Sequence, residues 1–215
     1  MNKSDRIRNQ WLGLLKQYRA IAIVRATSVQ QGVAMAQAAE AGGFRLIEVA
    51  WNNNTRPVEM VGAIRTALPH CVVGVGSVLC SADLQEALSA DAKFCFTPHT
   101  DAALIDLAQQ HELPMVAGAM TPTEIVTAWQ AGAASVKVFP ISQLGNEAYI
   151  RSLLGPLGPI PLVPTGGVTI ESAPVLMAAG AVAVGLSTAL FPKQEVIAEN
   201  WDAITARAAY LLAVV

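Results

Sequence analysis

Charged residues are scarce in this chain, and their scarcity excludes several classes of protein. Only 14% of the 215 residues are charged, and 14 Lys and Arg against 16 Asp and Glu give a net charge of −2. Because nucleic-acid binding needs clustered positive charge, and the chain has no basic run, we expect no nucleic-acid partner. Hydrophobic residues make up 53% of the chain, which excludes a disordered protein. This balance predicts a compact body, or a subunit that covers part of its surface in an oligomer.

Cysteines, long apolar runs and metal-binding motifs are also few. Cys71, Cys80 and Cys95 are odd in number and lack CxxC spacing, so we expect neither disulfides nor a zinc site. No apolar run reaches the roughly 18 residues of a membrane helix, and the charged N-terminal segment has no signal-peptide core. The three histidines form no HxH or HxxxH pattern. We therefore predict a cytoplasmic protein with no membrane contact, no metal and no cofactor.

Short β-rich runs recur about every 23 residues, and each gap between them has helical character. Alternating strands and helices indicate a parallel sheet, and eight such units fit a (β/α)8 TIM barrel. A doubly wound open sheet is the alternative, but the segment ATSVQQG after the first run lacks the expected GxGxxG turn. We predict one α/β barrel domain over residues 1–215, in which segment 1–19 is an extra helix covering the bottom. The predicted strands are 20–25, 44–51, 71–76, 93–97, 113–117, 135–139, 160–164 and 182–186.

One lysine lies inside a predicted strand, near the end where active sites of such barrels lie. In the run SVKVF, Ser135, Lys137 and Phe139 share one face, and the two valines fit the side that faces the helices. Burial would lower the pKa of Lys137, and a lysine so altered attacks ketones to form a Schiff base. The alternative is a lysine that only pairs with an inward carboxylate.

The inward carboxylate is Glu48, which shares the barrel side of the second predicted strand with Leu46, Ala50 and Asn52. A carboxyl group beside a Schiff-base lysine can move protons to and from the adjacent carbon. A structural ion pair with Lys137 is the other interpretation, and the two are not exclusive.

Glycine-rich turns follow the last two predicted strands. Thr165, Gly166 and Gly167 follow the seventh strand, and Gly185 and Ser187 lie at the end of the eighth. Loops at these two positions commonly bind phosphate in this fold, because glycine lets backbone N–H groups approach the anion. We therefore predict a phosphate site here, with an ordinary turn as the alternative.

Several short motifs, taken in order, resemble the 2-keto-3-deoxy-6-phosphogluconate (KDPG) and 4-hydroxy-2-oxoglutarate (KHG) aldolase family. They are IEVAWNN, GVGSVL, FTPH, VKVFP, VPTGGV and GLSTAL, and the match that contains them runs from about Ala20 to about Leu190. The resemblance implies a class I aldolase, usually a homotrimer, that splits KDPG into pyruvate and D-glyceraldehyde 3-phosphate. Another phosphate-binding barrel enzyme, or a non-catalytic phosphosugar-binding module, would explain the glycine turns but not the lysine and glutamate.

The resemblance also implies roles for individual residues. Lys137 looks like the Schiff-base lysine and Glu48 like the general acid/base. The carboxylate or pyruvyl end would contact Ser77, Arg25, Asn52, Pro98 and Phe139, and the phosphate would contact Thr165, Gly166, Gly167, Gly185 and Ser187.

Asn52 departs from the family pattern, because many members carry an arginine there that contacts the substrate carboxylate. Related aldolases for the galactonate epimer, 2-keto-3-deoxy-6-phosphogalactonate (KDPGal), also have an asparagine at this place. The resemblance therefore leaves the stereochemistry of the substrate open.

Overall fold

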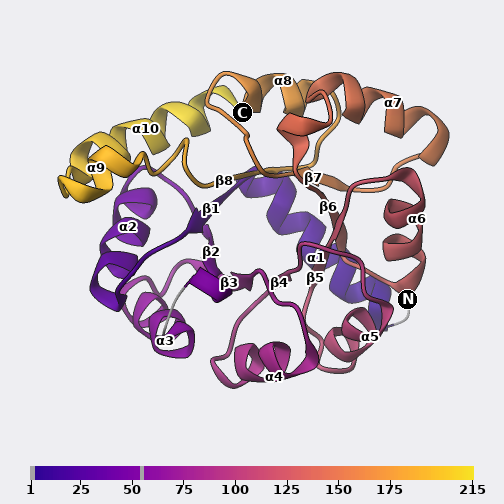
Figure 1. The fold of residues 1–215 in the computed structure, drawn as a ribbon, viewed down its shortest axis with the longest axis horizontal. Coiled ribbons are helices and arrows are strands. Elements are labelled where there is room, and N and C mark those ends of the chain that lie inside the picture. Colours follow the sequence, from indigo (N-terminus) through magenta and orange to yellow (C-terminus); the bar gives the residue numbers. More distant parts are fainter. Residues whose placement is uncertain (1–2, 54–55) are drawn as a thin grey trace.

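The computed structural model describes residues 3–53 and 56–215, and its strands form one parallel eight-stranded sheet. The strand order is β7-β6-β5-β4-β3-β2-β1-β8. The ends of this order meet through a bridge between Thr165 and Gly185 and a 3.0 Å hydrogen bond from Val182 N to Leu162 O. The predicted (β/α)8 barrel is therefore confirmed, and Figure 1 shows the strands at its centre. The strands are β1 (Ala20–Val24), β2 (Leu46–Ala50), β3 (Val72–Gly76), β4 (Cys95–Phe96), β5 (Met115–Ala119), β6 (Ser135–Val138), β7 (Leu162–Pro164) and β8 (Val184–Leu186).

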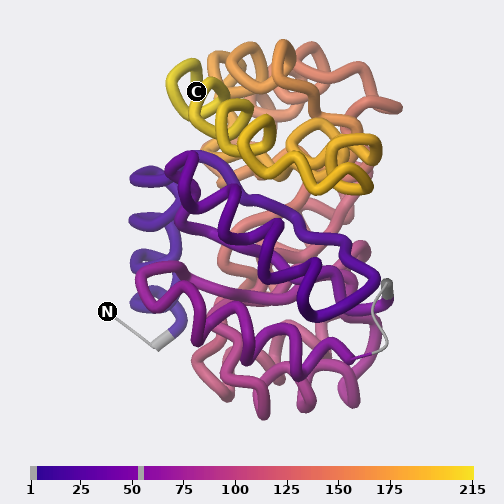
Figure 2. The backbone as a smooth tube through the Cα atoms, turned by 90° about the vertical axis from the view of Figure 1, so that its left-hand side faces the viewer, coloured from indigo at the N-terminus to yellow at the C-terminus, as the bar shows by residue number. Residues whose placement is uncertain are grey.

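Helices surround the barrel as an outer ring (Figure 1). The last helix packs beside the second (Figure 2), and Thr205 Oγ1 donates a 3.0 Å hydrogen bond to Ala38 O between them. No helix in the described ranges is long and apolar enough to cross a membrane. The helices are α1 (Lys3–Tyr18), α2 (Val29–Ala41), α3 (Pro57–Ala67), α4 (Ser81–Ser89), α5 (Ala102–Gln110), α6 (Pro122–Ala131), α7 (Glu147–Leu157), α8 (Ser172–Ala178), α9 (Lys193–Ile197) and α10 (Trp201–Val214), with short 3-10 turns η1 (Trp51–Asn53) and η2 (Ile141–Gln143).

Each strand sends alternate side chains to two different cores. Val136 and Val138 of β6 belong to the large core between the sheet and the helices. Val116 and Val163 belong instead to a smaller core inside the barrel. The strands are buried on both faces, as expected for a parallel sheet covered by helices, so a polar residue on the inner face is desolvated.

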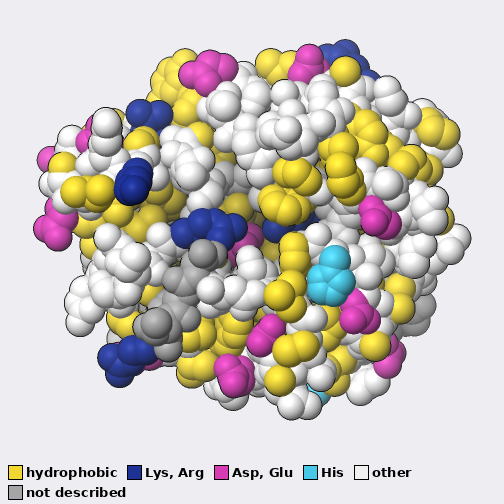
Figure 3. Space-filling model, viewed as in Figure 1, with side chains coloured by type: hydrophobic (Ala, Val, Ile, Leu, Met, Phe, Trp, Pro, Cys, Tyr) yellow, Lys and Arg dark blue, Asp and Glu magenta, His cyan; other side chains and the backbone are white. Residues whose placement is uncertain are grey.

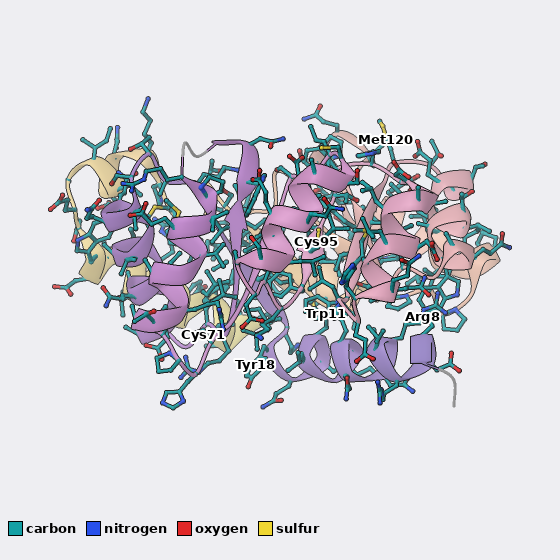
Figure 4. The ribbon with its side chains drawn as sticks, turned by 90° about the horizontal axis from the view of Figure 1, so that it is seen from below. Arg8, Trp11, Tyr18, Cys71, Cys95 and Met120 are labelled. Atoms are coloured by element: carbon teal, nitrogen blue, oxygen red, sulfur yellow. The ribbon has the colours of Figure 1, made fainter. Side chains whose placement is uncertain are left out.

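The inner core is closed at the bottom by α1, which lies apart from the helix ring (Figures 2 and 4). Trp11 of this helix is fully buried, with its ring 4.9 Å from the ring of Phe94 and 6.4 Å from that of Phe96. Its indole Nε1 donates a 2.9 Å hydrogen bond to Ser135 Oγ. The bottom of the barrel is thus filled, and access to its interior is from the C-terminal ends of the strands. The predicted leading segment also contained residues 1–2, which lie outside the described residues.

Candidate active site

A cavity of about 180 Å³ lies at the C-terminal ends of β1, β6, β7 and β8. On this face, Lys and Arg side chains gather around an acidic side chain at the centre (Figure 3). The cavity brings together most of the predicted site residues: Arg25, Lys137, Phe139, Thr165, Gly166, Gly167, Gly185 and Ser187. It therefore joins the predicted lysine to both predicted phosphate-binding turns.

Lys137 lies on β6 with its side chain inside the barrel, 3% exposed. Its Nζ lies 4.7 Å from the ring centroid of Phe139 and 5.9 Å from that of Phe96. Burial lowers the pKa of Lys137 because it disfavours the ammonium ion, while the nearby Glu48 acts in the opposite direction. The balance favours a neutral amine more than in a solvated lysine, and a neutral amine is the nucleophilic form.

Glu48 lies on β2 and is 1% exposed. Burial raises its pKa, against the opposing effects of Lys137 and Arg25. Its Oε2 has no hydrogen-bond partner, and none of the ion pairs of the described residues joins Glu48 to Lys137. The two groups are thus near enough to influence each other's pKa without a direct ion pair. An unpaired carboxyl oxygen beside a desolvated amine can exchange protons with a molecule bound between them.

The turn after β7 has a backbone that suits anion binding. Gly166 and Gly167 both adopt positive φ angles, +83° and +80°, a conformation that favours glycine. Two hydrogen bonds from η2 hold this turn, from Ile141 N to Thr165 O (2.9 Å) and from Ser142 N to Gly166 O (3.2 Å). The turn is therefore anchored, and its backbone lies against the cavity.

The opposite wall of the cavity comes from the ends of β8 and β1. Gly185 faces Thr165 so closely that a Cβ there would lie 2.7 Å from Thr165 Oγ1. Ser187 follows directly after β8, and the exposed Arg25 follows β1. A cationic side chain, hydroxyl groups and glycine turns thus surround one small volume, which is suited to a small anion.

The remaining predicted residues do not line this cavity: Glu48 lies within β2, while Ser77, Pro98 and Asn52 follow β3, β4 and β2. Ser77 comes directly after β3 and has a φ of +66°, which is unusual for serine. Pro98 follows β4, and its backbone lies so close to Gly118 that a Cβ there would be 2.3 Å from Pro98 C. Asn52 is exposed in η1 after β2. Ser77, Pro98 and Asn52 thus lie at the C-terminal end of the barrel, where the cavity opens.

Three residues that line the cavity were not predicted, namely Ile23, Val168 and Thr188. Ile23 lies on β1 two positions before Arg25, so strand alternation could have identified it. Val168 and Thr188 are direct neighbours of predicted turn residues, and the Thr188 hydroxyl adds a polar group. In the part of the chain that the structure describes, no group of three or more His, Cys, Asp or Glu residues could hold a metal ion.

Comparison with known proteins finds a family model over residues 13–207, described as KDPG and KHG aldolase. A 2-dehydro-3-deoxy-phosphogluconate aldolase from Treponema pallidum is 29% identical over 201 residues, covering 94% of this chain and 95% of that protein. A KHG/KDPG aldolase from Escherichia coli is 27% identical, with 86% of each chain covered. These matches extend over nearly the whole barrel.

Solved structures agree with this result. A structure described as native KDPGal has a TM-score of 0.82 and 27% identity, covering 91% of this chain and 93% of the other. The KDPG aldolase of Legionella pneumophila, captured with pyruvate as a covalent carbinolamine, has a TM-score of 0.86, covers 94% of this chain and 97% of the other, and is 20% identical. At that identity the likeness concerns the fold alone.

Proposed function

This chain belongs to the KDPG and KHG aldolase family, and from that premise we propose that it is a class I aldolase that cleaves KDPG into pyruvate and D-glyceraldehyde 3-phosphate. The observation that carries the proposal is Lys137, a buried amine with a lowered pKa in a cavity that also contains both glycine-rich turns. KHG, which lacks the phosphate, is a further expected substrate, because its keto acid end is the same.

The reaction begins when the neutral amine of Lys137 attacks the carbon-2 ketone. Loss of water gives an imine, which withdraws electrons from the neighbouring carbons. Removal of the proton from the carbon-4 hydroxyl then breaks the bond between carbons 3 and 4. The electron pair of that bond forms the enamine of pyruvate on Lys137, and the aldehyde product leaves.

Glu48 is the proposed proton carrier for both halves of this reaction. It accepts the hydroxyl proton, directly or through a water, and later protonates the enamine carbon. Burial raises the pKa of Glu48, which makes its carboxylate a stronger base when it accepts the hydroxyl proton and keeps the carboxyl group protonated until the return step. Hydrolysis of the resulting imine releases pyruvate and restores the free Lys137.

The two ends of the substrate carry different anions, and the site offers groups for both. For the pyruvyl end we propose Arg25, Ser77 and Asn52 as polar contacts, with Pro98 and Phe139 as walls. For the phosphate we propose the two glycine turns, including Gly185, together with Thr165, Ser187 and the neighbouring Thr188.

Borohydride reduction in the presence of pyruvate tests this proposal. We expect one pyruvate-derived adduct on the wild-type chain, located at Lys137 by peptide mass spectrometry, and KDPG cleavage in a coupled assay. Lys137→Met should lose both. The matched control is Lys93→Met, because Lys93 is exposed and pairs with Asp91. An adduct that persists in Lys137→Met, or no adduct on the wild type, would refute the assignment.

A second candidate substrate is KDPGal, and Asn52 is the observation that favours it. Asparagine replaces the arginine of many KDPG aldolases, and the structure described as native KDPGal is among the similar ones. Comparing kcat/KM for the two epimers decides between them. Asn52→Arg should then shift the ratio toward KDPG if this position sets the preference.

We further propose that the chain is a cytoplasmic homotrimer that works without a cofactor or metal. Symmetric oligomerisation is supported by a designed protein cage built from fused oligomeric domains, part of which is 27% identical to this chain. Exposed apolar side chains such as Leu79 and Met120 are candidates for an interface. The three cysteines are free thiols, which fits a reducing compartment. Light scattering on the purified chain gives the oligomeric state, and activity after chelator treatment tests the metal prediction.

A further inference from the structure

We propose that Gly76 is a positioning residue for proton transfer, because its missing side chain leaves the space that the carboxyl group of Glu48 occupies. This inference rests on the proposed role of Glu48. Gly76 is the last residue of β3, which pairs in parallel with β2 so that Glu48 lies beside Gly74 and Ala50 beside Gly76. The side chain of Glu48 therefore extends two residues along the neighbouring strand to reach Gly76.

The contact is close enough to exclude any other residue without movement. A Cβ built on Gly76 would lie 1.7 Å from Glu48 Oε1, 2.4 Å from its Cδ and 2.9 Å from its Cγ. Separations below 3.0 Å are essentially never seen for real Cβ atoms. Even alanine at this position would force the carboxyl group to leave its place.

The position of the Glu48 carboxyl group depends on this shape, because hydrogen bonding does not fix its Oε2 atom. Oε2 has no hydrogen-bond partner, and no ion pair of the described residues holds the group. A buried carboxyl group without such bonds is held by the atoms around it. The space left beside Gly76 therefore helps to set where the carboxyl group lies.

A substitution at Gly76 is expected to move the carboxyl group while the backbone stays in place. At Gly74 a Cβ would meet the ring and carbonyl of Phe94, and at Gly118 it would meet the backbone of Pro98. At Gly76 the three nearest atoms all belong to one side chain, whose end can rotate away. Gly76 lies in a strand and has no positive φ, so alanine is compatible with its backbone. The fold should therefore tolerate the change that proton transfer does not.

Gly76→Ala tests the inference through exchange of the pyruvate methyl protons in deuterated water. Exchange requires imine formation on Lys137 and then proton removal by Glu48, but not an aldehyde or phosphate. Because a displacement of about 1 Å costs on the order of 10²-fold, we expect exchange per imine to fall about 10- to 100-fold. Borohydride trapping of pyruvate and the melting temperature should stay near wild type. The control is Gly62→Ala, where a Cβ meets nothing within 4 Å.

A compensating change provides a second, independent readout. Glu48→Asp shortens the side chain by one methylene and withdraws the carboxyl group from Gly76. In the wild-type background this change should reduce exchange. In the Gly76→Ala background it should cost much less or restore part of the rate, because the shorter side chain no longer meets the new Cβ. Such non-additivity is the mark of two residues in direct contact.

The outcomes separate this inference from the proposed function. Unchanged exchange in Gly76→Ala, strictly additive effects with Glu48→Asp, joint loss of trapping and exchange, or an unfolded variant would each overturn the role of Gly76. Failure of the wild type to trap pyruvate would instead overturn the proposed function. If the wild type traps pyruvate and exchanges its protons but does not cleave KDPG, only the substrate is wrong, and the Gly76 test still applies.

Discussion

Glu48→Gln replaces one carboxylate oxygen by an NH2 group, which removes the titratable group and keeps the size of the side chain. If Glu48 carries the proton, the variant still forms the imine on Lys137 but cannot accept a proton from the pyruvate methyl group. General acid–base catalysis typically contributes about 10²–10⁴-fold. At about 1.4 kcal/mol for each factor of ten, this range corresponds to about 3–5 kcal/mol of activation free energy.

Glu48→Gln should slow proton transfer but should not reduce the nucleophilicity of Lys137. Glu48 raises the pKa of this lysine, so its removal should lower that pKa further, beyond the lowering already caused by burial. The fraction of neutral amine at neutral pH then increases. Trapping of pyruvate by borohydride should therefore be kept in the variant, while exchange of the methyl protons falls.

The pH dependence of exchange gives a separate signature. Burial raises the pKa of Glu48, so the carboxylate that accepts the proton forms at a higher pH than in a solvated glutamic acid. Exchange per imine in the wild type should rise with pH through this raised pKa, which lies above the ordinary value of about 4.3. In Glu48→Gln this rise should disappear, because the amide does not titrate.

A purely structural Glu48 leads to a different set of results. If Glu48 served only as a buried counter-charge to Lys137, its removal would leave that charge uncompensated, at a cost of up to about 3–5 kcal/mol, and in a protein of this size each kcal/mol lowers Tm by about 2–4 °C. Tm would then fall by about 6–20 °C, while exchange per imine would stay near wild type. The assays are trapping yield, proton NMR of pyruvate in deuterated water and thermal unfolding. Unimpaired exchange in a folded Glu48→Gln variant would refute the proton-transfer role.

Three further predictions concern other parts of the barrel. The yield of trapped pyruvate should rise with pH with a midpoint below the value of about 10.4 for a solvated lysine, because burial lowers the pKa of Lys137; a midpoint at the ordinary value would contradict this. Gly166→Val should reduce kcat/KM for KDPG by at least 10-fold more than for KHG, since it changes a positive-φ turn at the proposed phosphate site; equal losses would mean that the turn only shapes the barrel. Trp11→Ala should lower the free energy of unfolding by about 3–5 kcal/mol in denaturant titrations, with trapping retained in the folded protein, because Trp11 is fully buried at the end opposite to the cavity. Trp11→Phe is the milder control, since it removes the Ser135 hydrogen bond and keeps most of the packing.

The sequence by itself determined the barrel and the side of each strand that faces inward. Short β-rich runs and helical segments alternate so regularly that the sequence predicted all eight strands. The predicted and observed strands differ only at their ends; β4, for example, is two residues long where five were predicted. Strand periodicity placed Lys137 and Glu48 on the inner face, because alternate residues must point to opposite sides. Both side chains are buried in the structure.

Only the tertiary structure decided how close these residues come to one another. Periodicity gives the face of a strand but not its height in the barrel, which depends on how neighbouring strands are staggered around the closed sheet. That stagger places the Glu48 carboxyl group beside Gly76, a contact that no sequence pattern indicates. It also brings Arg25 from the first strand and Ser187 from the last to the same cavity as Lys137. This proximity follows from the closed barrel, in which the first strand pairs with the last.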